Sequence, residues 1–220
     1  MARQLVDELA TRAERLANVL DDAPVVGDVI SGRATDLTYH QFLRVSYQYV
    51  RASGPLLALT AAGLRRRGRY FRLAELAAIK SVEEAPHDRW ALADLAACGG
   101  DVDDAVCAPI PRSILAYIQW VEALAESGSP AYLGAAYLLE GISWRRAGQA
   151  ARRLCQAATI PHVDAAVTFL QAHGEADSAH VAVLDDVLAT IDDPGDRRAV
   201  LASADVLATL YPLFFAGTGR

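Results

Sequence analysis

Two histidines and one aspartate stand close together in the segment HGEADSAH, residues 173–180. Each residue of an α-helix advances by about 100°, so Asp177 lies about 40° from His173 and His180 about 20° away on the other side. All three side chains therefore project from one stripe, which apolar residues at the same spacing turn toward the interior. Because unpaired buried polar groups are costly, the stripe predicts either a hydrogen-bonded His–Asp pair in the core or a site for iron, manganese or zinc.

Gly174 directly follows the first of these histidines. Glycine weakens a helix because it loses more backbone freedom on folding than other residues do. A rigid platform for metal ligands would not be expected to contain one. We therefore interpret Gly174 as a weak point, which predicts local mobility of the segment that carries His173.

A single glutamate, Glu140, lies in the otherwise apolar stretch AAYLLEGISW, residues 135–144. A buried, ionised carboxylate needs a cation or strong hydrogen-bond donors. Arg145 and Arg146 could provide a salt bridge, but they follow by five and six residues, which is not the favoured spacing of four. A metal ion would satisfy Glu140 directly.

A third candidate lies in the segment VEEAPHDRWALADL, residues 82–95. Glu84 and His87 are three residues apart and share a helix face, and Glu83 is an alternative at a spacing of four. Glu-x-x-His is the recurrent element of diiron carboxylate sites in helix bundles. The same sequence is also compatible with an acidic residue at a solvent-exposed helix end. Asp94, one heptad after His87, could orient the imidazole of that histidine.

The three segments together supply three carboxylates and three histidines from three predicted helices, which is a plausible ligand set for two iron ions. The set comprises Glu84, His87, Glu140, His173, Asp177 and His180. The remaining histidines fit this set poorly. His40 lies in an amphipathic helix and His162 follows a proline in a loop, so we interpret both as structural.

The elements that position these residues are predicted to be helices throughout. Apolar periodicity and helix-ending residues predict helices over residues 2–20, 36–53, 70–98, 111–127, 129–158, 163–191 and 196–216, with a further helical stretch between Pro55 and the arginine cluster. Gly54-Pro55 is expected to interrupt a helix, and Pro86 to kink one or start a new one. Residues 23–34 and 101–111 are predicted as connections. The expectation is one all-α domain, residues 1–220, of about seven or eight helices.

Composition excludes several other classes of protein. With 53% hydrophobic residues and a mean hydropathy of +0.16, the chain can bury a substantial core. A net charge of −6 argues against a nucleic-acid binder, because phosphate binding needs a basic surface. The short cluster of arginines at residues 65–69 is interpreted as a solvated helix end.

The cysteines and the apolar runs bear on location. The odd number of cysteines, without CxxC spacing, favours reduced thiols in the cytoplasm; they are Cys98, Cys107 and Cys155. The N-terminal residues mix both charges into an apolar periodicity, unlike a signal peptide. No run of 18 or more apolar residues occurs, so we expect no membrane span.

The order of the motifs resembles the heme-oxygenase-like diiron oxidases and oxygenases. Glu-x-x-His comes first, a lone glutamate in an apolar helix follows, and His-x-x-x-Asp-x-x-His comes last; EEAPHDRWALADLAACGGD and AYLLEG also look like segments of that family. The resemblance spans nearly the whole chain and implies the heme-oxygenase-like fold. It further implies two Fe(II) ions in a labile site, O2 as co-substrate, an external electron donor and a peroxo-diiron(III) intermediate. Many such proteins are dimers, so a homodimer is compatible with it.

The resemblance implies an oxidation of a small molecule. N-oxygenation of a small amine or heteroaromatic amine in a specialised biosynthetic pathway is favoured, which a small polar pocket would suit. Oxidative C–C cleavage or desaturation of an amino or fatty acid is the alternative, which an apolar tunnel would suit. The candidate pocket residues, with Arg51 as a further anchor for an anion, are Tyr47, Trp90, Tyr137, Trp144 and Arg145.

Two readings without iron chemistry remain open. One is a thiaminase-type hydrolase on the same fold with a cysteine nucleophile. The other is a binding protein without catalytic activity. Neither needs the six candidate ligands.

Overall fold

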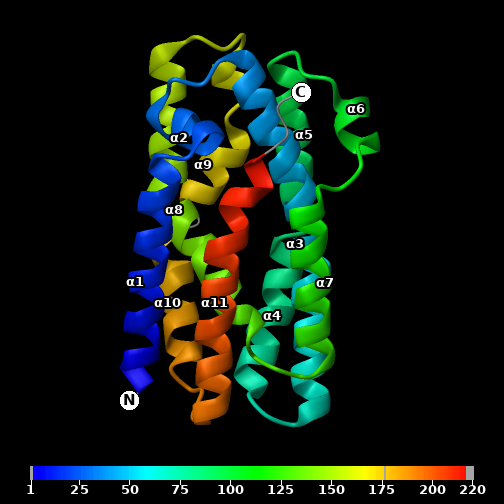
Figure 1. The fold of residues 1–220 in the computed structure, drawn as a ribbon, viewed down its shortest axis with the longest axis vertical. Helices are drawn as coiled ribbons and strands as arrows, with labels where there is room; N and C mark the ends of the chain where they lie inside the picture. The colour runs from blue at the N-terminus through cyan, green and yellow to red at the C-terminus, as the bar shows by residue number, and fades with distance from the viewer. Residues whose placement is uncertain (1, 176, 217–220) are drawn as a thin grey trace.

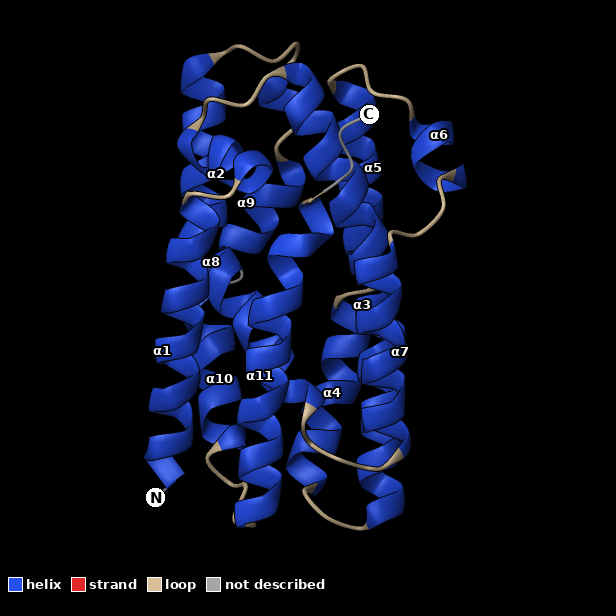
Figure 2. Ribbon diagram, in the orientation of Figure 1, coloured by secondary structure: helices blue, strands red, loops and turns tan. Residues whose placement is uncertain are grey.

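The computed structural model describes residues 2–175 and 177–216, and within them the side chains of residues 4–174 and 181–216. Helices and the loops between them account for all of the described chain (Figure 2). The elements are α1 (Ala2–Asp21), α2 (Pro24–Ser31), α3 (Asp36–Arg67), α4 (Phe71–Glu83), α5 (His87–Ala97), α6 (Val102–Cys107), α7 (Arg112–Glu126), α8 (Tyr132–Ala157), the 3-10 turn η1 (Val163–Ala165), α9 (Thr168–Glu175), α10 (Asp177–Leu188) and α11 (Pro194–Phe215). The predicted all-α class is confirmed.

Two long helices organise the bundle. On one side α3 packs against α4, α5 and α7, and on the other α8 packs against α1, α9 and α11 (Figure 1). The core between them consists of aliphatic and aromatic side chains that are fully buried, such as Leu9, Leu43, Leu95 and Phe214. Burying each side chain of this size stabilises the fold by about 1.5–3 kcal/mol. The candidate ligands lie on elements of both halves, so packing of the halves decides whether they meet.

Two predicted interruptions are absent, and the helices are longer or more numerous than expected. Residues 23–34 were predicted as a connection but contain α2, which begins with Pro24 and ends at Gly32 in the left-handed conformation. α3 continues through Pro55, so the predicted interruption at Gly54-Pro55 is wrong. Gly54 lies against α4, where a Cβ would approach the carbonyl oxygen of Ser81 to 2.9 Å. Packing of α3 on α4 therefore offsets the cost of proline inside a helix.

Two other predicted helices have different bounds. The segment 70–98 forms α4 and α5, so Pro86 precedes a new helix rather than kinking one. The single long helix expected over residues 163–191 begins instead at Thr168, after η1, and its range contains two helices, α9 and α10. The connection predicted at residues 101–111 contains the short α6, whose cap is Asp101. These divisions and the additional helices α2 and α6 explain why there are more helices than the seven or eight expected.

α11 is the described helix that could cross a membrane by length and composition. It has 22 residues, and its mean hydropathy reaches 1.3. In the structure it packs against α8, α1 and α7, and the buried face includes Leu207 and Phe214. Of its apolar stretch, 39% is buried inside the bundle.

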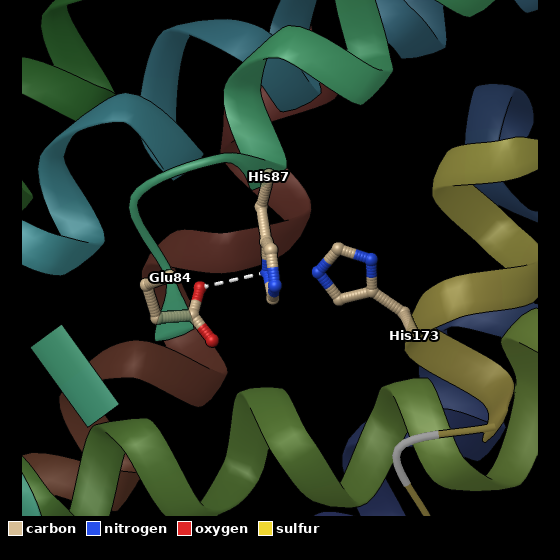
Figure 3. Close-up of side chains that lie close together, drawn as sticks. All are labelled: Glu84, His87 and His173. Atoms are coloured by element: carbon tan, nitrogen blue, oxygen red, sulfur yellow. Dashed lines mark ion pairs between the residues drawn. The ribbon is translucent and has the colours of Figure 1, made fainter. Parts of the chain in front are cut away.

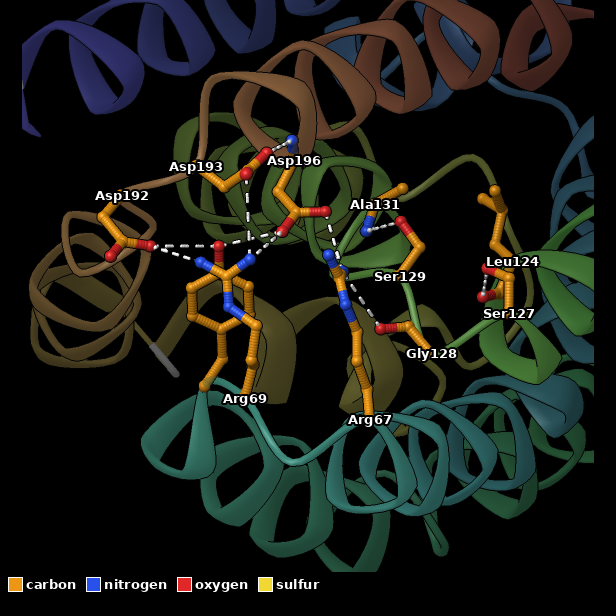
Figure 4. A network of polar contacts seen from close by, with 11 residues as sticks. Arg67, Arg69, Leu124, Ser127, Gly128, Ser129, Ala131, Asp192, Asp193 and Asp196 are labelled. Atoms are coloured by element: carbon orange, nitrogen blue, oxygen red, sulfur yellow. Dashed lines mark hydrogen bonds and ion pairs between the residues drawn. The ribbon is translucent and has the colours of Figure 1, made fainter.

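Ion pairs join the end of α3 to the start of α11 (Figure 4). One carboxylate oxygen of the buried Asp196 accepts a hydrogen bond from Arg67 at 2.8 Å, and the other accepts from the Tyr70 hydroxyl at 2.8 Å. Arg69 donates to Asp192 at 2.8 Å. Part of the arginine cluster is therefore paired rather than simply solvated, which corrects the sequence interpretation. The network holds α11 against α3 at this end of the bundle.

Candidate metal centre

Three of the six predicted ligands come together between α4, α5 and α9. Glu84 follows the end of α4, His87 begins α5 and His173 lies on α9, and their side chains face one another (Figure 3). One ligand atom from each residue lies within 4.8 Å of those from the other two. The turn before Pro86 brings Glu84 and His87 to the same point. A metal ion between the three side chains would contact all of them.

The geometry around His87 fits a metal ligand. Its Nδ1 lies 3.1 Å from Oε2 of Glu84, but not in a hydrogen-bonding direction, so this buried nitrogen has no hydrogen-bond partner among the described residues. Buried polar atoms are normally paired, and a metal ion would supply the missing interaction. The ring of Trp90 stacks on that of His87, with centroids 4.4 Å apart, and limits its rotation.

His173 presents one nitrogen to the same point. Its Nδ1 lies 2.7 Å from the carbonyl oxygen of Phe169, which can only accept, so Nδ1 carries the proton and Nε2 the lone pair. Such a hydrogen bond orients a histidine that binds metal through its other nitrogen. Burial, with a contribution from His87, lowers the pKa of His173. The neutral ring that metal binding requires is therefore favoured.

The charge state of Glu84 also suits a ligand. Burial raises the pKa of its carboxyl group, but the contact with His87 and the nearby His173 and Lys80 outweigh burial, so the pKa is lowered. The carboxylate is therefore ionised at neutral pH, although only 15% of its side chain is exposed. An ionised carboxylate and a neutral imidazole together are the protonation states of a metal site.

Glu83 and Glu140 share a partner outside this cluster. Oε2 of Glu83 lies 3.1 Å and Oε1 of Glu140 lies 3.5 Å from Nζ of Lys80. The sequence left open whether Glu83 or Glu84 is the ligand. Glu84 is thus the one that lies beside the histidines. Arg145 and Arg146 pair with Glu14 and Asp21 on α1. The sequence could not show that Lys80 is a partner of Glu140, because the two residues lie on different helices.

Asp177 and His180 belong to α10, which begins at Asp177. Their side chains lie outside the described residues, so their roles as ligands remain predictions. Of the other histidines, Nε2 of His40 lies 3.1 Å from the carbonyl oxygen of Cys98, and His162 is exposed in a loop. Both positions agree with structural roles.

Asp94 supports His173 rather than His87, which corrects the expectation from its heptad spacing. Its buried carboxylate accepts hydrogen bonds from the backbone N–H groups of Thr168 at 3.1 Å and Phe169 at 2.7 Å. These are the first residues of α9, so Asp94 on α5 acts as the cap of α9 from a distance. The carbonyl oxygen of Phe169 in turn accepts a hydrogen bond from Nδ1–H of His173. The carboxylate therefore connects the two helices that carry the histidines.

Replacing Asp94 with asparagine is expected to weaken both the fold and metal binding. An amide has one acceptor oxygen, so one N–H at the start of α9 loses its partner, which lowers the free energy of unfolding by about 1–3 kcal/mol. Iron affinity falls because α9 loosens below His173. Urea unfolding and iron titration measure the two effects. Asp101→Asn at the exposed cap of α6 is the control and should change neither; an unaltered Asp94→Asn protein would contradict this role.

A cavity of about 80 Å³ lies beside the cluster. Apart from tyrosines, the polar side chains that line it are Ser53, Lys80, Glu84, Glu140, Ser143 and His173. Leucine, alanine and valine side chains and three tyrosines line the rest, and the hydroxyl groups of two of them, Tyr49 and Tyr211, lie 3.0 Å apart. The cavity is therefore small and mainly apolar, with its charged groups at the candidate metal site.

The five residues predicted for the substrate pocket lie elsewhere. Among the described residues that line this cavity none of the five occurs, although Trp90 borders the cluster through its contact with His87. Tyr47 receives a hydrogen bond from Arg51 and Tyr137 lies beside Asp185. The remaining two lie near the surface, where the guanidinium of Arg145 lies 4.8 Å from the ring of Trp144, which is 43% exposed. The presence of an aromatic residue in the sequence did not distinguish a position in a pocket wall from a position in the core or at the surface.

The cysteines do not contribute to this cavity in the part of the chain that is described. Cys98 is buried, and burial raises the pKa of its thiol to about 11. Burial likewise raises the pKa of Cys155, while Cys107 is exposed. A raised pKa disfavours the thiolate that a nucleophile requires.

Comparison with known proteins agrees with the fold and the candidate site. Residues 40–211 match the family model described as iron-containing redox enzyme. The chain therefore belongs to this family of iron-containing redox enzymes, and the suspected relationship to heme-oxygenase-like oxidases is confirmed at this level. No curated protein matches the chain.

Three solved structures are similar to this chain over most of their lengths. A domain of unknown function with a heme oxygenase-like fold from Shewanella denitrificans is 20% identical, with a TM-score of 0.79, and the match covers 96% of this chain and 89% of that one. A TenA homolog from Pseudomonas syringae pv. tomato is 15% identical, with a TM-score of 0.72 and the same coverage. A TenA homologue protein from P. horikoshii is 15% identical, with a TM-score of 0.68, covering 97% and 99%. These likenesses confirm the heme-oxygenase-like fold.

Proposed function

We propose that this iron-containing redox enzyme is a non-heme diiron oxygenase that uses O2 to N-oxygenate a small amine or heteroaromatic amine. The observation that carries the proposal is the cluster of Glu84, His87 and His173 beside a small cavity. Its protonation states and the unpaired nitrogen of His87 suit a metal ion. The family supplies iron as the metal.

Different residues of the chain would bind the two ions. In this proposal Glu84, His87 and His173 hold the first ion, and Glu140, Asp177 and His180 complete the set for the second. Trp90 and the Phe169 carbonyl fix the orientation of the two histidine rings. Bound Fe(II) would supply O2 activation and redox chemistry. The apolar wall keeps bulk water away from the reacting groups.

The size of the cavity favours a small substrate. Pockets for drug-sized ligands have volumes of roughly 300–1,000 Å³. This cavity, with a volume of about 80 Å³, is much smaller. A small amine therefore fits better than a long acyl chain. One oxygen atom of O2 would be transferred to the amine nitrogen, while the other leaves as water with two electrons from an external donor and two protons. Cleavage or desaturation of a small amino acid is the alternative outcome.

Anaerobic loading with Fe(II), followed by exposure to O2, tests the proposal. We expect about two iron ions per chain, a transient visible absorbance on mixing with O2 and uptake of O2 with a reductant. A panel of small amines and amino acids with ¹⁸O2 should yield a product carrying one labelled oxygen on nitrogen. Labelled or desaturated carbon products would favour the alternative chemistry.

Two results would contradict the proposal. A protein that binds no iron and consumes no O2 with any reductant would indicate a binding protein. Activity that survives chelation but disappears on cysteine alkylation would indicate a hydrolase with a thiol nucleophile. The cysteine positions favour neither result.

A further inference from the structure

Lys80 is the only lysine in the sequence. All the others of the 21 lysines and arginines are arginines. It lies on α4, one turn before Glu84, and only 15% of its side chain is exposed. It also lines the cavity that holds Glu84, Glu140 and His173. The one lysine side chain of the sequence is therefore placed beside the candidate metal centre.

Within the described residues, Lys80 contacts carboxylates on two different helices. Nζ lies 3.1 Å from Glu83 on its own helix and 3.5 Å from Glu140 on α8. Among the described residues, Glu140 is not part of the cluster formed by Glu84, His87 and His173. Lys80 thus contacts a carboxylate that the proposed function assigns to the second ion.

We propose that the Lys80 ammonium is a built-in counter-ion for Glu140, which the second divalent ion must displace in order to bind. This inference rests on the proposed function and deepens it, since it explains how loading of the two positions is ordered. The first ion binds the preformed cluster, in which Lys80 acts on Glu84 only through its nearby charge. The second competes with Lys80 for Glu140.

The chemistry of lysine fits an exchangeable counter-ion better than that of arginine would. An ammonium group is a compact point charge, whereas the planar guanidinium grips a carboxylate with two parallel hydrogen bonds. The 3.5 Å contact to Glu140 is longer than a charge-assisted hydrogen bond of about 2.7–2.9 Å. Glu83 remains beside Lys80 when Glu140 is released, so the exchange does not leave the ammonium group unpaired.

Variants at this position should change affinity for the second ion in opposite directions. In anaerobic titrations of the full chain with Co(II) and Fe(II), Lys80→Met is expected to bind the second equivalent about tenfold more tightly than the wild type, because a competing cation is removed. Lys80→Arg should bind the second equivalent more weakly, because the planar guanidinium group of arginine holds Glu140 more firmly. The first equivalent should be affected less than the second, because Lys80 contacts Glu140 directly but acts on Glu84 only through its nearby charge.

The outcomes separate this inference from the proposed function. If the second equivalent binds Lys80→Met no more tightly than the wild type, or both variants weaken it, Lys80 is not the competing counter-ion. If the wild type and both variants bind no metal at all, the proposed function itself fails. If the wild type holds one ion and Lys80→Met holds two, the competition is supported.

The single lysine also permits a test without mutation. Biosynthetic labelling with ¹³C-lysine gives one Cε signal in a ¹H–¹³C spectrum, and diamagnetic Zn(II) can be titrated into the protein. We expect this signal to move mainly with the second equivalent, when Glu140 is taken from Lys80. A signal that completes its movement with the first equivalent, or does not move while two ions bind, would overturn the inference.

Discussion

Replacing His173 with asparagine is expected to remove tightly bound iron, whereas the same change at His162 leaves iron binding intact. His173 is one of the three side chains of the cluster, and its Nε2 faces the point between them. Loss of residues that merely support a metal ligand weakens affinity by roughly 10–100-fold, so loss of a ligand should exceed that. O2 uptake should fall with the iron content.

Equilibrium dialysis against Fe(II), with thermal unfolding of the metal-free proteins, measures this effect. His162 is an exposed residue in the left-handed conformation, which asparagine tolerates, so His162→Asn tests for nonspecific binding by surface histidines. Wild-type iron content in His173→Asn would refute the assignment of this cluster. A loss of iron in both variants would show that binding is not confined to it.

Replacing Gly174 with alanine is expected to displace α9 from α8 and to weaken iron binding by at least about tenfold, as for supporting residues of metal sites. A Cβ at Gly174 would lie 2.5 Å from the backbone nitrogen and 2.7 Å from the Cα of Gly148. Backbone atoms cannot move aside as a side-chain end does, so the helices must separate. Such overpacking lowers the free energy of unfolding by about 1–3 kcal/mol and moves His173, the preceding residue.

Gly148→Ala is the matched control at the same helix contact. A Cβ there meets its nearest neighbours at 3.7 Å, which is ordinary van der Waals contact. Because Gly148 lies inside α8, alanine should be neutral or stabilise the protein by up to about 1 kcal/mol. Chemical unfolding and iron titration of both variants test the asymmetry. Equal tolerance of alanine at the two positions would contradict the close approach of α8 and α9.

The helical fold and the kinds of ligand could be predicted because both depend on local spacing. Apolar periodicity placed most helices, and carboxylates or histidines on apolar stripes marked the groups that need partners in the core. His173 was selected on the second ground, and Glu84 and His87 by their Glu-x-x-His spacing; the structure brings the three together. The same reasoning failed at Pro55, where contact with α4 maintains the helix, and in residues 23–34, where a short helix with a buried face forms.

The interpretation of Gly174 changed most between sequence and structure. By helix propensity it was a weak point, whereas in the fold it is the position at which two helix backbones meet. A propensity scale describes an isolated helix and contains no information on a neighbour that will lie within van der Waals distance. Asp94 changed in the same way, since its buried carboxylate caps a helix far away in the chain.

Residue type and spacing alone thus established an all-α chain with a set of six candidate ligands on three of its predicted segments. Folding decided which of two adjacent glutamates faces the histidines, that Lys80 is a partner of Glu140, and that Asp94 supports α9. These three facts depend on contacts between helices that are distant in sequence. Periodicity specifies which face of each helix is buried, but the distance and rotation between two helices follow from side-chain packing across their whole interface.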